Sequence, residues 1–411
     1  MTDLSVSVVI VSRGRPDALR RCLIGVSQLQ YKSYEVIVVS DPEGLKSARG
    51  LPFAQDLKLV PFDKPNISVA RNLGIADAAG DIVAFIDDDA VPEPQWLHFL
   101  VAPVEQRDVA AMGGFVRGRN GISYQWKARS LDRFGEAHDL ELENDNAIVL
   151  NPPKGRAIKT EGTNMAVRRS VLIELGGFDP AFHYFLDETD LNMRLARAGY
   201  ATAIIPLAEV HHGFAANRMR ASNRVPRDLF DIGASWAVFQ RKHVVASERV
   251  AQWKRLRAQE RSRLVRHMIG GGLEPRSVRQ LMRRLDLGYV EGLERALGGA
   301  ALAKHPSAPF KPFPRLQRKA TVIASRPIRF ARDMQLAKER VKSGEIVTLI
   351  SLSLTAMFHH VFFNDYGVWV QRGGLFGKSD RAGPFFRMTT RSRRTEKERR
   401  RVARQRGFGK N

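Results

Sequence analysis

The stretch DIVAFIDDDAVP, residues 81–92, decides the fold class of this chain. Its first half has the apolar, β-branched composition of a buried strand, and Asp87, Asp88 and Asp89 follow that strand directly. Three adjacent carboxylates repel one another, so holding them together is costly unless a cation neutralises them. Mg²⁺ and Mn²⁺ suit such oxygen ligands and usually bind substrate phosphates as well. The position of the acids at the carboxyl end of a predicted strand favours a metal site over a solvated acidic turn or helix start. Asp87 and Asp89 lie on the same side of an extended chain, so one can hold the substrate while the other reaches the metal.

The sequence around this stretch alternates strand-like and helix-like segments. Strands are expected at residues 6–11, 35–40, 58–61 and 81–86, and helices at residues 15–30, 67–79 and 92–104. This order predicts a doubly wound, Rossmann-like α/β sheet whose ligands bind at the carboxyl ends of the strands. Ser12, Arg13 and Asp41 fall at those ends, together with the three aspartates.

Two later motifs carry groups suited to catalysis. The sequence DETDLNMRL, residues 187–195, has helical spacing, and one of its acids can serve as general base for an acceptor hydroxyl. The helix dipole stabilises acidic side chains at the start of any helix, so the alternative is that these acids only cap the helix. His211 and His212 follow a strand-like run and are candidate metal ligands. An imidazole ligand suits Mn²⁺ better than the all-oxygen ligand set that Mg²⁺ prefers.

Residues 5–215 resemble the family 2 glycosyltransferases, because they contain, in the family's order, the motifs SVVIVSRGRPDALRRCL, EVIVVSD, ISVARNLGI, FIDDDAVP, EGTNMAVRRS, GGFDPAF, FLDETDLNMRL and PLAEVHH. No motif is decisive alone, but the ordered set is specific. The resemblance implies the GT-A fold, a nucleotide-sugar donor, a divalent cation (Mn²⁺ or Mg²⁺) and an inverting mechanism.

The resemblance also assigns roles to residues on the donor side. Asp41 matches the aspartate that contacts the nucleotide base. Arg71 and Asn72 match the pair near the nucleotide and its phosphates, and Asp87 and Asp88 match the nucleotide side of the DXD motif. The loops at residues 12–15 (SRGR) and 40–43 (SDPE) depart from the usual family sequences. The donor therefore stays open among UDP-, GDP- and dTDP-sugars.

Further roles concern the metal, the base and the acceptor. Asp89 matches the metal ligand of the family, and a count from Pro206 gives His212 as the family's histidine, with His211 second. Glu188 takes the position of the base, and the order of the acids leaves Asp187 as an alternative. The loop that lines the acceptor side in the family is matched by Gly162, Thr163 and Asn164.

Charge divides the chain into two unlike halves. The net charge is +23, yet residues 1–220 hold 25 basic and 28 acidic residues, whereas residues 221–411 hold 41 and 15. We therefore expect a GT-A domain followed by a mainly helical, basic extension. The expected segments are a GT-A domain (1–225), a basic helical extension (226–303), a Pro-rich linker (304–316), a C-terminal subdomain that is a candidate for association with a membrane surface (317–390) and a disordered basic tail (391–411).

The basic half has three interpretations. It is a set of solvated helices packed on the catalytic domain, or a surface for anionic lipid that would suit a lipid-linked acceptor, or a binder of acidic polymers. No nucleic-acid motif supports the last. The longest uncharged run, residues 346–363, is too polar for a membrane span and suits a buried or interfacial segment. The single cysteine, Cys22, and the absence of a basic leader at the N-terminus predict a cytoplasmic protein. If the basic half binds anionic lipid, the protein is expected to be peripheral at the inner membrane face.

The predicted function is transfer of a sugar from a nucleotide-diphosphate donor to a hydroxyl of a glycan or lipid-linked acceptor, in the synthesis of cell-surface polysaccharide. A sugar-phosphate nucleotidyltransferase would share the sheet and the aspartates, but it does not predict the DETDL helix or the two histidines. A degenerate, non-catalytic scaffold predicts loss of the acids, and the acids are all present.

Overall fold

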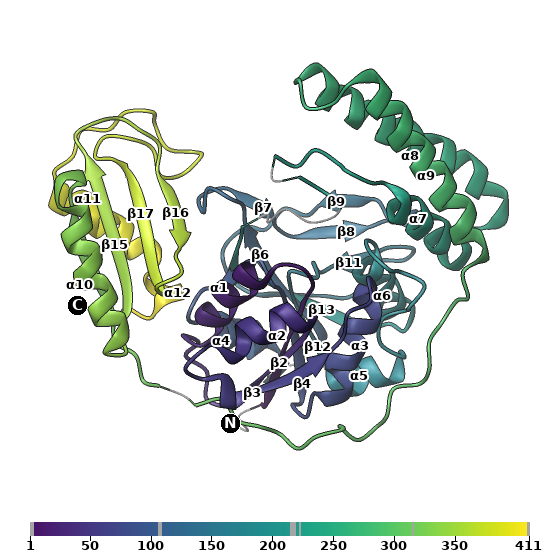
Figure 1. Cartoon of the computed structure of the whole chain (residues 1–411), viewed down its shortest axis with the longest axis horizontal. Coiled ribbons are helices and arrows are strands. Elements are labelled where there is room, and N and C mark those ends of the chain that lie inside the picture. The colour runs from purple at the N-terminus through teal and green to yellow at the C-terminus, as the bar shows by residue number, and fades with distance from the viewer. Residues whose placement is uncertain (1–3, 106–108, 214–218, 222, 315, 409–411) are drawn as a thin grey trace.

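The computed structural model describes residues 4–105, 109–213, 219–221, 223–314 and 316–408 (Figure 1). Parts of the predicted segments 1–225, 304–316 and 391–411 therefore lie outside the described residues.

A sheet of parallel strands forms the first part of the chain. Its strands are β1 (Val6–Ser12), β2 (Tyr34–Ser40), β3 (Leu57–Pro61) and β4 (Ile82–Asp87), in the spatial order β3-β2-β1-β4. The helices between them are α1 (Pro16–Val26), α2 (Pro42–Arg49) and α3 (Ile67–Asp77). This order is the doubly wound arrangement that the sequence predicts.

Later strands extend the same sheet on the β4 side. They are β5 (Ala90–Pro92), β6 (Val109–Arg117), β7 (Tyr124–Trp126), β10 (Ile148–Leu150), β12 (Asn164–Arg168) and β13 (Ala201–His212). β12 runs antiparallel to both β4 and β6, and β13 runs parallel to β6. As a result β4, β6 and β13 point the same way, and their carboxyl ends share one edge of the sheet.

Helices cover both faces of this sheet. Val8 and Ile10 of β1 pack with α1 and with α4 (Trp96–Val101) on one face. Val9 packs on the other face with α3, α5 (Arg169–Glu174) and α6 (Asp187–Arg197). The alternation of side chains along β1 thus serves two cores, which is why its sequence is almost continuously apolar.

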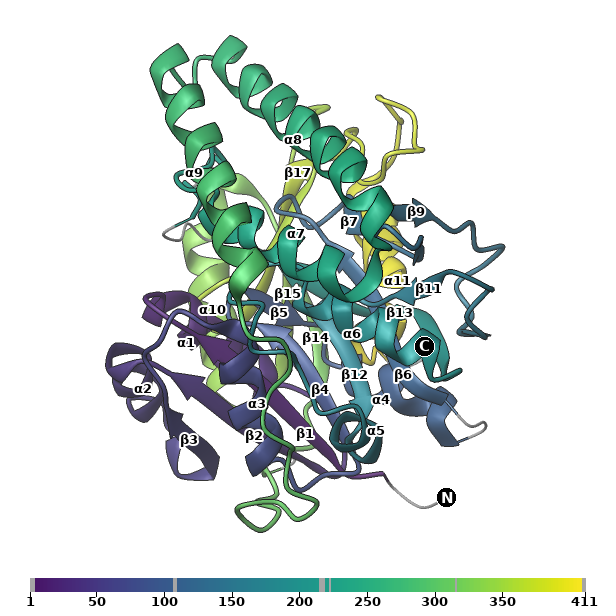
Figure 2. The ribbon, with the colours of Figure 1, turned by 90° about the vertical axis from the view of Figure 1, so that its right-hand side faces the viewer.

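The chain also forms a small sheet and a helical extension outside the main sheet. The small sheet has the order β11-β8-β9 and consists of β8 (Arg129–Leu131), β9 (Ala137–Asp139) and β11 (Ala157–Lys159). The extension consists of α7 (Phe230–His243), α8 (Ala246–Ile269) and α9 (Pro275–Glu294). α8 and α9 form a hairpin that projects away from the sheet (Figures 1 and 2).

Two glycines let α9 approach α7 closely. A Cβ atom at Gly288 would lie 1.9 Å from the carbonyl oxygen of Phe230, and one at Gly292 would lie 2.3 Å from that of Ala234. Between α8 and α9, the rings of Trp253 and Tyr289 stack with centroids 3.8 Å apart. The predicted helical extension is confirmed.

The last part of the chain is not helical throughout. It contains a second sheet of order β14-β15-β17-β16, whose strands are β14 (Ala320–Ser325), β15 (Ile346–Ser353), β16 (His360–Phe363) and β17 (Val368–Gly374). Helix α10 (Phe330–Lys342) packs on this sheet. The uncharged run at residues 346–363 is β15, β16 and the loop between them. Among the described residues, no helix combines the length and apolarity needed to cross a bilayer.

The structure corrects the prediction of a disordered tail. Helices α11 (Arg391–Arg401) and α12 (Ala403–Arg406) occupy this segment, and only residues 409–411 lie outside the described residues. Arg394 and Glu398 are buried, and Glu398 accepts hydrogen bonds from Gln371 of β17 and from Ser379 in the loop after β17. High charge density predicts disorder only while the charges stay in water, and here they pair inside the protein.

Candidate active site

Two predicted metal ligands, Asp89 and His212, lie together with Asp87, predicted on the nucleotide side, at the carboxyl edge of the main sheet. One ligand atom from each of Asp87, Asp89 and His212 falls within 4.8 Å of the others. Asp87 ends β4, and Asp89 stands in the turn between β4 and β5. β5 pairs with β13 so that Ala90 lies opposite His212, which brings His212 Nε2 to 3.1 Å from Asp89 Oδ1. We refer to these three residues as the Asp87 cluster.

The tautomer of His212 suits a cation. Its Nδ1 lies 2.9 Å from Oε1 of Gln125, and a carboxamide oxygen only accepts, so Nδ1 carries a proton. The other nitrogen, Nε2, therefore faces Asp89 and is the atom that would bind a cation. Two carboxylates and one imidazole held this way fit Mn²⁺ or a similar divalent ion, with Gln125 orienting the imidazole.

Asp88 does not join the Asp87 cluster. It is fully buried, accepts a hydrogen bond from the Ser12 hydroxyl at 2.6 Å and pairs with Arg15 at 2.5 Å. Burial raises the pKa of Asp88 to about 7, although the Arg15 charge opposes the rise. Arg15 also reaches Asp89 at 3.3 Å. Of the three adjacent aspartates, Asp88 anchors the loop after β1, and the other two face the site.

The loops after β1 and β2 are tied together by Asp41. Its carboxylate caps α2 by accepting from the backbone N–H of Gly44 at 3.0 Å, and it accepts from that of Gly14 at 2.7 Å. Gly14 has a left-handed φ of 67°, which suits a residue without Cβ. Arg13 pairs with Asp63 on the surface at 2.8 Å. Ser12, Arg13 and Asp41 thus lie on the same edge of the sheet as the cluster.

Arg71 connects the Asp87 cluster with the acids of α6. This buried guanidinium pairs with Asp187 and lies 3.6 Å from Asp87. A Cβ atom at Gly162 would lie 2.4 Å from Arg71 Nη2, so glycine at that position leaves room for the arginine. Beside it, the Thr163 hydroxyl donates to Asp87. Gly162 and Thr163 therefore line the site as predicted for that loop.

The two acids that start α6 titrate differently. Burial raises the pKa of Asp187 to about 7, helped by the Glu188 charge and opposed by Arg71. Burial would raise the pKa of Glu188 too, but the positive charges of Lys159 and Arg71 outweigh it and lower that pKa. Glu188 is also the more accessible side chain, with 17% exposed against 3% for Asp187. The neighbouring ammonium of Lys159 lies 3.3 Å from Glu188.

The backbone before α6 is strained. Phe185 and Leu186 have φ of 72° and 65°, in the left-handed region that residues other than glycine rarely adopt. Such a conformation persists only where the surroundings impose it, and it is frequent at functional sites. Here Leu186 is buried, and Phe185 packs edge-on against Trp236 of α7. The helical extension thus helps to fix the position of Asp187 and Glu188.

Three predicted site residues turn out to have structural contacts. The amide of Asn72 both donates to and accepts from the backbone of Phe178. The buried Asn164 accepts from the Trp96 indole at 2.7 Å and donates to two backbone carbonyls. His211 projects from the opposite side of β13 to His212, and its Nε2 lies 2.9 Å from Glu93. The structure does not bring these three side chains to the Asp87 cluster.

His211 belongs to a second acidic cluster with Glu93 and Glu209, which we call the Glu93 cluster. Each of its carboxylates has its own guanidinium: Arg406 of α12 binds Glu93 through two contacts of 2.9 Å, and Arg117 binds Glu209. Burial lowers the pKa of His211, although the bond to Glu93 opposes this. With both carboxylates paired, this cluster has no need of a cation.

Residues 4–228 of the chain match the model of the family described as glycosyltransferase-like family 2. The chain belongs to this family. The α/β fold with a helical extension, predicted from the sequence, agrees with that membership.

The relatives of the chain also align with about half of its length. The chain is 29% identical over 181 residues to the glucosyl-dolichyl phosphate glucuronosyltransferase of Haloferax volcanii, with 43% of this chain and 56% of that protein covered. It is 34% identical over 194 residues to the succinoglycan biosynthesis protein ExoM of Rhizobium meliloti, with 44% and 58% covered. A crystal structure of GalNAc-T7 with UDP, GalNAc and Mn²⁺ is similar at 18% identity and a TM-score of 0.42, with 51% and 44% covered. The chain spans about half the length of the curated relatives it matches.

Several residues around the candidate active site were not predicted from the sequence. Arg15 and Lys159 contact the predicted acids, Gln125 orients His212, and Arg406 reaches the neighbouring Glu93 cluster. Arg15 belongs to the loop at residues 12–15 that follows the first strand, so the position of that loop was a usable signal. Lys159 lies two residues before the motif EGTNMAVRRS, whereas Gln125 and Arg406 come from segments far from any motif, and the sequence carries no signal for these two.

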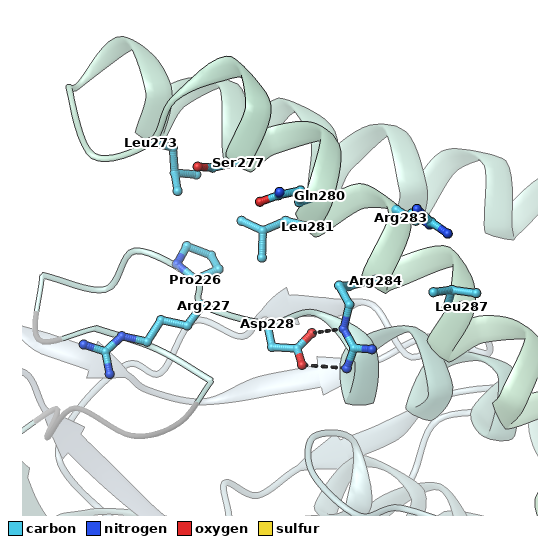
Figure 3. A pocket seen from close by; sticks show the side chains of 10 residues that line it. All are labelled: Pro226, Arg227, Asp228, Leu273, Ser277, Gln280, Leu281, Arg283, Arg284 and Leu287. Carbon is cyan, nitrogen blue, oxygen red and sulfur yellow. Dashed lines mark hydrogen bonds and ion pairs between the residues drawn. The ribbon is translucent and has the colours of Figure 1, made fainter.

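A separate recess of about 590 Å³ lies along α9 (Figure 3). It is lined by Pro226, Arg227, Asp228, Leu273, Ser277, Gln280, Leu281, Arg283, Arg284 and Leu287. Its one carboxylate, Asp228, pairs with Arg284 at 2.8 Å. The recess therefore offers basic and apolar groups and lacks the acidic ligands found at the Asp87 cluster.

Proposed function

We propose that the protein is an inverting glycosyltransferase that moves a sugar from a nucleotide-diphosphate donor to an acceptor hydroxyl. The observation that carries this proposal is the arrangement of two groups of acids on either side of Arg71. The Asp87 cluster lies on one side, and Asp187 with Glu188 lies on the other. The donor diphosphate can therefore bind beside the Asp87 cluster, and the acceptor hydroxyl can lie beside Asp187 and Glu188.

The charge balance at the carboxyl edge supports a bound cation. Two guanidiniums, Arg15 and Arg71, are shared by four aspartates, namely Asp87, Asp88, Asp89 and Asp187. Asp87, Asp89 and His212 are the residues that would hold Mn²⁺ or Mg²⁺. Such an ion, when bound, stabilises the negative charge that develops on the leaving diphosphate. Arg71 adds a fixed positive charge next to the same position.

Glu188 is the proposed general base. Because its pKa is lowered, its carboxylate is ionised at neutral pH and can accept the proton of the acceptor hydroxyl. That oxygen then attacks the anomeric carbon from the face opposite the diphosphate, whose bond to the sugar breaks. One displacement inverts the configuration. Lys159 holds the carboxylate in place, and the left-handed residues before α6 fix its helix.

The acceptor class is proposed from the names of the relatives. The names of two relatives point to a dolichyl phosphate-linked sugar and to succinoglycan synthesis. We therefore propose a glycan or lipid-linked acceptor in the synthesis of a surface polysaccharide, and UDP-, GDP- and dTDP-sugars as the donors to test.

Glu188→Gln tests the proposal most directly. We expect donor binding to persist in the presence of Mn²⁺ and the transfer rate to fall by about 10²-fold or more, since the base is lost while the donor site remains. Calorimetric titration with UDP, GDP and dTDP identifies the nucleotide, and turnover is then followed with the matching nucleotide-sugars.

Glu174→Gln on α5 is the matched control, because Glu174 bonds only Tyr200 among its described partners and lies outside the site. It should retain normal turnover. Near-normal turnover of Glu188→Gln would exclude Glu188 as the base, and absence of nucleotide binding under every metal condition would overturn the transferase proposal.

A further inference from the structure

Two loops at one end of the second sheet expose several large apolar side chains. One loop joins β15 to β16 and the other joins β17 to α11, and both leave the sheet at the same edge because β15 and β17 are parallel. Between 55% and 76% of each of these side chains is exposed: Leu354, Met357, Phe358, Phe385, Phe386 and Met388. Exposed apolar residues that gather in this way mark interaction surfaces.

The two loops support each other. The rings of Phe358 and Phe385 stack with centroids 6.0 Å apart, and those of Phe376 and Phe386 lie 5.4 Å apart. Backbone hydrogen bonds join Arg387 to Phe376 and Gly374 to Met357. The two loops are therefore joined into one frame, and we call their six exposed apolar residues the apolar tip.

Positive charge surrounds the apolar tip. Residues 372–393 contain six basic residues and one acid, Asp380. The ammonium of Lys378 lies 4.6 Å from the centroid of the Phe385 ring, and Arg387, two residues after Phe385, is exposed. Phenylalanine and methionine enter the acyl region of a bilayer, whereas lysine and arginine extend to anionic headgroups. The excess of positive charge favours anionic lipid over an apolar protein surface.

A second element of similar character lies at the same end of the molecule. The turn between α8 and α9 exposes 79% of Ile269, and Arg263, Arg266 and Arg276 are close to it in the chain. Figures 1 and 2 place this turn and the loops of the apolar tip at one end of the molecule. One flat surface can therefore meet both.

We propose that the apolar tip docks the protein on an anionic lipid bilayer, with the α8–α9 turn as a second contact. Delivery of a lipid-linked acceptor by this docking rests on the proposed function, whereas the docking itself does not. The docked protein needs no spanning helix, since two shallow apolar insertions reinforced by basic side chains suffice for peripheral binding.

Vesicle flotation of the full chain tests the proposal. We expect the protein to float with vesicles that contain phosphatidylglycerol and to stay behind with pure phosphatidylcholine, and added salt should weaken the binding. Phe358→Ser/Phe385→Ser should lower the bound fraction by about tenfold or more, because two aromatic side chains no longer leave water. Val250→Ser/Val290→Ser, which changes two exposed residues at the base of the α8–α9 hairpin, is the matched control and should float normally.

A charge variant, Lys378→Gln/Arg387→Gln, provides a second measurement that leaves the apolar side chains in place. It should also reduce flotation with anionic vesicles. Unchanged flotation of both variants, or no flotation of the native chain, would overturn the docking proposal. Nucleotide binding is measured on the same samples. Native binding in a protein that does not float rejects the docking alone, whereas flotation without nucleotide binding rejects the transferase proposal alone.

Discussion

The Asp87 cluster and the Glu93 cluster contain the same chemical groups but differ in their counterions. Each has two carboxylates and one of the adjacent histidines of β13. In the Glu93 cluster each carboxylate has its own arginine, whereas the arginines near the Asp87 cluster are shared with the buried Asp88 and Asp187. Acids and a histidine within reach of one another therefore do not define a metal site. The number of arginines committed to them decides whether negative charge is left over.

The difference also separates two roles. The Glu93 cluster joins the end of the chain to the main sheet, since Arg406 of α12 reaches Glu93 between β5 and α4. The Trp369 ring of the second sheet packs edge-on against His211 and lies 4.3 Å from the Arg406 guanidinium. Stability is therefore expected to depend on the Glu93 cluster, and catalysis on the Asp87 cluster.

Glu93→Gln should have the largest effect on stability. It leaves the Arg406 guanidinium buried without its charge partner, and breaking such a pair costs about 3–5 kcal/mol in the free energy of unfolding. Urea unfolding measures this loss. Adding Arg406→Met should recover part of it, because no unpaired charge then remains buried. Glu396→Gln, on the exposed face of α11, is the control and should unfold like the native protein. A Glu93→Gln protein of native stability would contradict the structural role.

Asp89→Asn should lower the transfer rate and leave the stability of the protein almost unchanged. We expect the transfer rate to fall by about 10²-fold, which corresponds to about 2.7 kcal/mol in the activation free energy, because a predicted metal ligand is lost. Thermal unfolding without metal should change little, while the stabilisation by Mn²⁺ plus nucleotide should disappear. Asp81→Asn, just before the other end of β4, is the control and should keep that stabilisation. If Asp89→Asn is still stabilised by Mn²⁺ and nucleotide, the comparison between the two clusters breaks down.

Lowering the pH should destabilise the protein gradually through the Glu93 cluster, and by less than the Glu93→Gln substitution does. Arg406 and His211 lower the pKa of the buried Glu93 and outweigh its desolvation. The unfolded chain therefore binds a proton that the folded chain does not, once the pH falls below about 4.3, the ordinary pKa of glutamate. The native protein should lose stability below that pH more steeply than Glu93→Gln does, by at most about 1.4 kcal/mol per pH unit. Parallel urea-unfolding curves for the two proteins across this range would refute the assignment.

The sequence by itself determined the α/β fold, the order of the first strands and the segments that supply the acids. It did so because burial on both faces of a sheet leaves continuous apolar runs, and because ligands collect where parallel strands end. The family followed from the order of motifs along the chain, and the helical extension followed from its spacing.

Only the tertiary structure decided which predicted residues reach the site. His211 and His212 are equivalent in sequence, yet alternation along β13 directs them to different clusters. Asp88 and Asn164 carry suitable groups but are held by partners distant in sequence, Arg15 and Trp96. The high charge of the segment from Arg391 predicts disorder, but Arg394 and Arg406 in this segment pair with the buried carboxylates of Glu398 and Glu93. Each outcome depends on contacts between segments far apart in the chain, which local sequence does not encode.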